Sequence, residues 1–158
     1  MKTLVLGMGN DMFGDDGIGL HIVRQLRDNK GLQKSLSEKS EDVDFIECTL
    51  CGLALLDVIQ GYDRLIMIDT INKEKPETGR IHVIEEFQIR HIPGPSPHYI
   101  SVPQAMEIGR KIGLKMPTEI RIVAVESKNL YNLGEGLTAE MKKVIPEIVQ
   151  KTTELIMQ

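Results

Sequence analysis

Short apolar runs alternate along the chain with segments in which apolar residues recur at helical spacing. Five runs are typical of strands: residues 3–6, 43–48, 64–69, 80–84 and 119–125. Helical spacing begins with Ile18, Ile22, Val23 and Leu26, and helices are also predicted over residues 53–59, 101–113 and from Thr138, a favourable N-cap, onward. Strand and helix therefore follow one another over nearly the whole sequence.

Three stretches depart from this alternation. Residues 31–42 are polar and are predicted to form a surface loop. Residues 87–98 contain three prolines, which cannot donate to a strand ladder, so irregular backbone is expected there. The next helix is expected to begin at Ser101, which forms a capping-box pattern with Gln104. Pro146 lies inside the last helical segment and is expected to kink or interrupt it.

Repeated strand–helix–strand units predict an α/β fold with a mainly parallel sheet and helices on both faces. Parallel strands are buried on both sides and therefore have continuous apolar runs, as residues 4–6 and 65–68 do. Neither an internal repeat nor a linker is evident in the sequence. The prediction is one three-layer domain over residues 1–158.

The composition fits a single globular domain. The chain has 158 residues, 41% of them hydrophobic, which suffices for a sizeable core. Aromatic residues make up only 4% and tryptophan is absent, so an aliphatic core is expected. The net charge of −4 and the few aromatic rings argue against a nucleic-acid-binding protein.

The sequence also bears on the expected compartment. No apolar run approaches the roughly 18 residues that span a bilayer, so no membrane partner is expected. Too few apolar residues follow Met1 and Lys2 to form a signal peptide. Cys48 and Cys51 are too few for a disulfide framework. These features favour the reducing cytoplasm.

Acidic residues gather where two predicted strands end. The loop after the first strand, GMGNDMFGDDGIG, carries Asp11, Asp15 and Asp16, and Asp69 closes the run RLIMID. In open α/β sheets, ligands bind beyond the carboxyl ends of the strands. If the two strands are parallel neighbours, Asp16 and Asp69 lie at the same edge of the sheet.

Other interpretations of these acids remain open at this point. Gly7, Gly9 and Gly14 resemble a dinucleotide-binding loop, but their spacing is wrong for G-x-G-x-x-G and acids stand where phosphates would bind. Asp15 or Asp16 can instead cap a helix, and one can do so while the other faces the cleft. A strand-end aspartate such as Asp69 can simply hydrogen-bond a turn.

A histidine completes a candidate metal site. His98 follows Pro95 and Pro97, which stiffen the chain before the next helix. Two carboxylates and one imidazole suit a divalent first-row metal and leave coordination positions open for water or a substrate group. This donor set does not distinguish nickel from zinc. The other three histidines are expected to be structural or solvated: His21, His82 and His91.

Three sequence blocks in this order resemble the hydrogenase maturation endopeptidases. They are GMGNDMFGDDGIGLHIVRQL, RLIMIDTIN and SPHYISVPQAMEIGRKIG, with a weaker likeness in NLGEGLTAEMKKVIPEIV. The resemblance covers nearly the whole chain and implies a twisted five-stranded sheet flanked by helices. It also implies that Asp16, Asp69 and His98 are the catalytic and metal-binding residues. Some members of the family carry glutamate at the position of Asp16.

The same resemblance implies an activity and a partner. The family recognises nickel already inserted in the large-subunit precursor of a [NiFe] hydrogenase and then removes a C-terminal extension. Nickel is therefore expected to arrive with the precursor, and zinc or cadmium is expected to substitute for it in a crystal. A water polarised by the metal or a carboxylate is expected to attack the peptide bond, with Asp16 or Asp69 as the base. We expect a monomer.

Two rival functions remain open from the sequence. The first is a non-catalytic chaperone that binds nickel or the precursor without cleaving it. The second is a dithiol redox protein built on Cys48 and Cys51, whose C-x-x-C spacing is a departure from the family pattern. The sequence contains neither G-x-S-x-G nor H-E-x-x-H, so an acyl-enzyme or an ordinary zinc protease is not expected.

Overall fold

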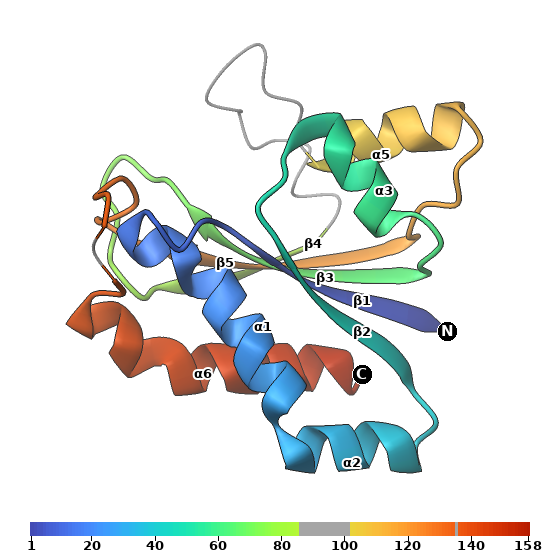
Figure 1. The fold of residues 1–158 in the computed structure, drawn as a ribbon, viewed down its shortest axis with the longest axis horizontal. Coiled ribbons are helices and arrows are strands. Elements are labelled where there is room, and N and C mark those ends of the chain that lie inside the picture. The colour runs from blue at the N-terminus through green and yellow to red at the C-terminus, as the bar shows by residue number, and fades with distance from the viewer. Residues whose placement is uncertain (86–101, 135) are drawn as a thin grey trace.

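Five apolar segments form one sheet in the computed structural model, which describes residues 1–85, 102–134 and 136–158 (Figure 1). The strands are β1 (Lys2–Met8), β2 (Asp42–Cys48), β3 (Arg64–Ile71), β4 (Ile81–Glu85) and β5 (Glu119–Glu126). Their order across the sheet is β2-β1-β3-β5-β4. Only β4 runs antiparallel to its neighbour within the described chain, so the predicted mainly parallel sheet is confirmed.

Helices cover both faces of this sheet (Figure 1). The helical segments are η1 (Gly14–Gly17) and η2 (Gly52–Leu55), which are 3₁₀ turns, and α1 (Ile18–Asp28), α2 (Lys30–Glu38), α3 (Leu56–Ile59), α5 (Val102–Lys111) and α6 (Ala139–Ile156). Helices α1, α2 and α6 pack on one face, and α3 and α5 pack on the other. The predicted three-layer α/β arrangement is thus confirmed.

The central strand β3 feeds both halves of the core. Leu65 and Met67 belong to the apolar cluster beneath α3 and α5, whereas Ile66 and Ile68 belong to the cluster beneath α1 and α6. Successive side chains of a strand alternate between the two faces of its sheet. By the same alternation, the side chain of Asp69 lies on the α3–α5 face of the sheet and that of Thr70 lies on the α1–α6 face.

The prediction of a surface loop over residues 31–42 is wrong for most of that stretch. Helix α2 occupies it, and the side chain of Asn29 caps this helix by accepting a hydrogen bond from the amide of Leu32 at 3.0 Å. Leu32 and Leu36 are buried one turn apart, and the remaining helical positions are mostly exposed. Two apolar residues among polar ones give too weak a periodic signal to identify so short a helix.

The last helix also differs from expectation. Thr138 caps it as predicted, accepting a hydrogen bond from the amide of Met141 at 3.2 Å. Pro146 does not interrupt the helix, which continues to Ile156. The irregular backbone expected over residues 87–98 and the helix start expected at Ser101 lie outside the described residues. Among those that are described, no helix is long and apolar enough to cross a membrane.

Candidate active site

The two acids singled out from the sequence meet at one edge of the sheet. Strands β1 and β3 are parallel neighbours, and Gly7 near the end of β1 pairs with Ile68 of β3. The loop that leaves β1 therefore starts beside Asp69, and it carries Asp16 within η1. Figure 1 shows this loop, at the start of α1, on the same side of the molecule as the segments that follow β3 and β5. The expected shared edge is confirmed for Asp16 and Asp69.

Asp16 is held through both of its carboxylate oxygens. Its Oδ2 accepts a hydrogen bond from the backbone amide of Asn10 at 3.0 Å. Its Oδ1 accepts a hydrogen bond from the hydroxyl of Thr70 at 3.0 Å. Two donors on two different oxygens restrict the rotation of the carboxylate. The side chain remains partly exposed.

Asp69 is a carboxyl group whose pKa lies above its ordinary value. Burial, opposed by a hydrogen bond from the Thr70 amide and assisted by the nearby charge of Asp16, raises the pKa of Asp69 to about 7. The Thr70 amide donates to Oδ1 at 2.8 Å. Within the described chain, Oδ2 of Asp69 has no hydrogen-bond donor. At neutral pH this group is therefore able both to give and to take a proton.

The neighbouring acid Asp15 has a different role. It is fully buried and accepts hydrogen bonds from the Ser127 hydroxyl at 2.6 Å and from the amide of Thr138 at 2.8 Å. The Thr138 hydroxyl donates to it as well, at 2.9 Å. Asp15 thus ties the loop after β1 to the end of β5 and to the start of α6. Neither η1 nor α1 has a side-chain cap, so Asp15 does not cap its own helix.

Glycines bring the helix and the sheet close enough for this edge to form. Gly9 has a φ of 139°, and a Cβ there would collide with the carbonyl oxygen of Asp16. A Cβ on Gly19 would collide with the carbonyl oxygens of Met8 and Ile68. The first turn of α1 therefore lies directly on the ends of β1 and β3. The glycine-rich loop serves this close approach, which explains its spacing without a nucleotide.

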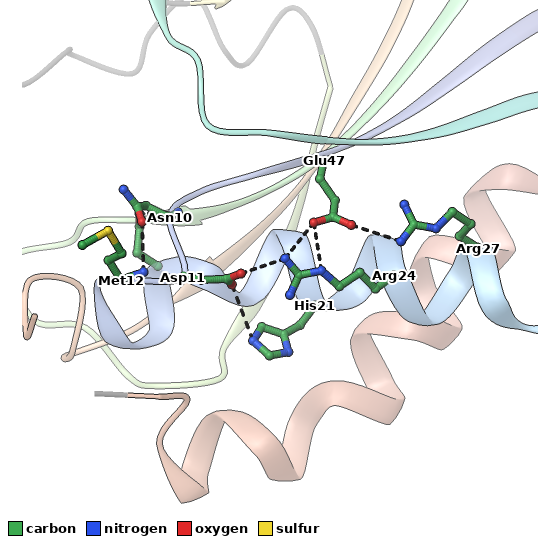
Figure 2. Close-up of polar contacts among 8 residues, drawn as sticks. Asn10, Asp11, Met12, His21, Arg24, Arg27 and Glu47 are labelled. Atoms are coloured by element: carbon green, nitrogen blue, oxygen red, sulfur yellow. Dashed lines mark hydrogen bonds and ion pairs between the residues drawn. The ribbon is translucent and has the colours of Figure 1, made fainter. Parts of the chain in front are cut away.

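Charged residues fasten the loop that carries Asn10 to the helix and the sheet (Figure 2). Arg24 of α1 forms ion pairs with Asp11 and Glu47, each at 2.7 Å, and Arg27 reaches Glu47 at 3.1 Å. Hydrogen bonding to Arg24 lowers the pKa of Glu47, and the two acids in turn raise the pKa of Arg24. Because Asn10 donates to Asp16, this network steadies one of the two contacts that orient the acid.

Two histidines lie in structural surroundings, as expected. His82 of β4 lies 3.2 Å from Glu126 at the end of β5, and His21 lies 3.7 Å from Asp11. Burial alone would raise the pKa of Glu126, but hydrogen bonds from the Glu77 amide and His82 outweigh it and lower the pKa. Lys73 adds a charge 3.7 Å away. Glu126 is therefore an ionised, paired group that joins the loop after β3 to β4.

The third predicted ligand lies outside the described residues. His98 and His91 both fall within residues 86–101, so the structure tests neither. In the described ranges, no group of three His, Cys, Asp or Glu side chains is placed to hold a metal ion. Asp16 and Asp69 supply carboxylate oxygens only, and a complete site for a first-row metal needs a further donor such as an imidazole.

The cysteine pair is divided between interior and surface. Cys48, the last residue of β2, is buried, whereas Cys51 is exposed, and both are free thiols.

Sequence reasoning had not singled out Thr70 or Asn10, which contact the acids. The signal for Thr70 is its position directly after a strand-end acid. Asn10 acts through its backbone amide, which any residue other than proline would supply there.

Comparisons with known proteins bear on the family of this chain. A family model described as hydrogenase maturation protease matches residues 21–155. The chain is 25% identical over 158 residues to the hydrogenase expression/formation protein HupD of Rhizobium leguminosarum bv. viciae, covering 98% of this chain and 74% of HupD. It is 27% identical to the hydrogenase 2 maturation protease of Escherichia coli K12, covering 96% of this chain and 88% of that protein.

A solved structure shares the fold. The hydrogenase maturating endopeptidase HybD from E. coli matches with a TM-score of 0.79 at 23% identity, and the match covers 99% of this chain and 93% of HybD. This structural match shows the fold. The family shows in the family model, which matches well over half of the sequence, including Asp69 and position 98. On that match, this chain belongs to the hydrogenase maturation protease family.

Proposed function

We propose that this protein is an endopeptidase that removes the C-terminal extension from the nickel-containing large-subunit precursor of a [NiFe] hydrogenase. The observation that carries the proposal is the pair of carboxylates, Asp16 and Asp69, at the carboxyl edge of the sheet in a member of the maturation protease family. HybD, which shares the fold, is named a maturating endopeptidase. The curated E. coli relative is likewise named a maturation protease.

Nickel enters this reaction as part of the substrate. Asp16, Asp69 and His98 are proposed to engage the nickel of the precursor through its open coordination positions, which holds the scissile peptide bond close to the acids. The two carboxylates supply anionic oxygen donors, and His98 supplies the nitrogen donor that the family resemblance implies. We expect zinc or cadmium to occupy the same donors when nickel is absent.

Asp69 is the better candidate for the general base. A base works best when its pKa lies near the working pH, and burial raises the pKa of Asp69 to about 7. Its Oδ2 has no donor within the described chain, whereas both oxygens of Asp16 already accept hydrogen bonds. Asp69 is proposed to take the proton of the attacking water and later to pass it to the leaving amine. Asp16 orients the substrate.

The surroundings of the acids suit a polypeptide substrate. Tyr131, Leu133 and Met12 are 74%, 66% and 60% exposed, although large apolar side chains are usually buried. The backbone joins them: the amide of Gly134 donates to the carbonyl of Met12 at 2.8 Å. Asn72, two residues beyond Thr70, donates to the Tyr131 hydroxyl at 3.4 Å. Exposed apolar groups next to a site commonly mark a protein-binding surface.

We expect the reaction to take place in the cytoplasm, where the free thiols of Cys48 and Cys51 stay reduced. The decisive experiment incubates the protein with nickel-loaded and nickel-free precursor and weighs the products by mass spectrometry. Loss of the C-terminal tail from the nickel-loaded form alone is the expected result. An intact precursor that stays bound would identify a binding chaperone instead.

Variants of the acids complete this test. Asp16→Asn, Asp69→Asn and His98→Ala are expected to fold and to lose processing. Asp28→Asn is the matched control, because this acid, 77% exposed at the end of α1, lies at the opposite end of that helix from Asp16. Processing by Asp69→Asn at the rate of the unaltered protein would contradict the proposed role of that acid.

A further inference from the structure

Thr70 contacts both acids of the candidate site at once. Its hydroxyl donates to Oδ1 of Asp16 at 3.0 Å, and its backbone amide donates to Oδ1 of Asp69 at 2.8 Å. The strand alternation places the side chains of Asp69 and Thr70 on opposite faces of the sheet. The hydroxyl thereby lies on the face of α1, which follows Asp16, while the amide remains next to Asp69.

We propose that Thr70 is a positioning residue that fixes the orientation of both carboxylates before the substrate binds. The inference rests on the proposed function, in which the two acids face the nickel-containing end of the precursor. Thr70 itself touches neither nickel nor the scissile bond. It acts through Asp16 and Asp69. Its hydroxyl contacts Asp16 and its backbone amide contacts Asp69, so the two contacts are separate.

The hydroxyl is the contact that can be removed alone. A threonine hydroxyl has one proton, and in this structure Asp16 accepts it. Without it, the hydrogen bond from the amide of Asn10 is the one that Asp16 keeps among the described residues, and the carboxylate rotates more freely. Losing a partner that orients a metal-binding group typically costs about 10- to 100-fold in metal affinity or activity. The amide contact to Asp69 survives any non-proline substitution at position 70.

The test compares two variants at position 70 with one control. Thr70→Val keeps the branched shape and deletes the hydroxyl, and Thr70→Ser restores the hydroxyl. Thr118→Val removes a hydroxyl at the other end of the sheet, where it lies 3.5 Å from the carbonyl of Asp63. With nickel-loaded precursor, kcat/KM is expected to fall about 10- to 100-fold in Thr70→Val and to stay within about threefold in the other two.

A second measurement examines Asp16 in the protein alone. The ¹³C signal of its side-chain carboxyl is expected to shift or broaden in Thr70→Val and to return to its original position in Thr70→Ser, with Asp28 as the internal reference. Such a pattern distinguishes orientation of the acid from a general loss of stability, which a thermal melt reports separately.

The outcomes separate this inference from the proposed function. A folded Thr70→Val variant with an unchanged Asp16 signal, or with unchanged cleavage, would overturn the role of Thr70. If the unaltered protein fails to cleave the precursor, the proposed function fails. The Asp16 signal then decides by itself whether the threonine orients the acid.

Discussion

The carboxylate of Asp15 accepts hydrogen bonds from both the amide and the hydroxyl of Thr138, at 2.8 Å and 2.9 Å. This contact joins the loop after the first strand to the N-cap of the last helix. Its immediate neighbour Asp16 turns instead toward Thr70 at the sheet edge. The two adjacent acids therefore have different roles. Asp15 stabilises the fold, and Asp16 faces the candidate site.

This division predicts opposite consequences for the two acids. Asp15→Ala leaves three hydrogen-bond donors without their acceptor in the protein interior. The free energy of unfolding is therefore expected to fall by about 3 kcal/mol. Asp16→Ala removes a partly exposed acid and is expected to cost less than about 1 kcal/mol while abolishing processing. Urea denaturation of both variants measures the difference. Equal losses of stability would show that the two acids share one structural role.

The raised pKa of Asp69 predicts a pH-dependent stability. The folded protein binds this proton with a pKa of about 7, against an ordinary value of 3.8, so between these values it holds more protons than the unfolded chain. The contribution of Asp69 to the free energy of unfolding therefore declines as pH rises from about 4 to about 7 and is constant above. For a partly exposed group we expect a decline of about 2 kcal/mol.

Comparison with Asp69→Asn isolates this contribution, because the amide does not titrate. The difference in unfolding free energy between the variant and the unaltered protein is expected to grow in favour of the variant across that pH range. Asp28→Asn, tested alongside, should show no such trend. A difference that is independent of pH would mean that Asp69 titrates at its ordinary pKa.

The same pKa predicts how cleavage responds to pH. A general base works only when ionised, so the rate of tail removal is expected to rise about tenfold per pH unit below pH 7 and to level off above it. The pH profile of kcat/KM, which reports groups of the free enzyme, is measured with nickel-loaded precursor between roughly pH 5.5 and pH 8.5. A rate that falls over this interval would assign the base to another group.

Two glycines in neighbouring helices predict opposite effects of one substitution. A methyl group on Gly19 would collide with the backbone of both β1 and β3, so Gly19→Ala is expected to lose at least about 3 kcal/mol of stability. At Gly31 in α2 the nearest atom lies at an ordinary contact distance, 3.4 Å. Gly31→Ala is therefore expected to gain up to about 1 kcal/mol from helix propensity. Thermal melts of the pair check both signs.

The exposed apolar residues beside the acids predict a contribution to substrate affinity. Leu133→Ser is expected to raise KM for the precursor about fivefold with little change in kcat, because a lost apolar contact of ordinary size costs roughly 1 kcal/mol. Ile112 is equally exposed, 65% against 66%, but follows α5. Ile112→Ser is the matched control and should leave KM unchanged. Equal effects of both changes would argue against a local docking role.

Most of the fold was predictable because its strands and longer helices have strong periodic patterns. Helix α2 was not, since only Leu32 and Leu36 face the core and its cap, Asn29, is a common surface residue. The position of the acids was predictable for a different reason. Asp16 and Asp69 each follow an apolar run, and the topology of a parallel sheet brings such strand ends together.

The contacts that define each acid were beyond sequence reasoning. Asp16 meets Thr70 across 54 residues, and Asp15 meets Thr138 across 123 residues. Which of two adjacent acids turns inward depends on the backbone of a 3₁₀ turn and on partners far along the chain. The raised pKa of Asp69 likewise depends on how completely the assembled fold removes water from it.

The strand order β2-β1-β3-β5-β4 places β1 and β3, the strands that lead to the two acids, in the interior of the sheet. Interior strands open only with the whole domain, whereas edge strands fray at much lower free energy. Amide hydrogens of Leu6 and Met67 should therefore exchange with deuterium on the timescale of global unfolding. The edge of the sheet that carries Asp16 and Asp69 is accordingly anchored in the slowest-exchanging part of the molecule, even while β2 and β4 open locally beside it.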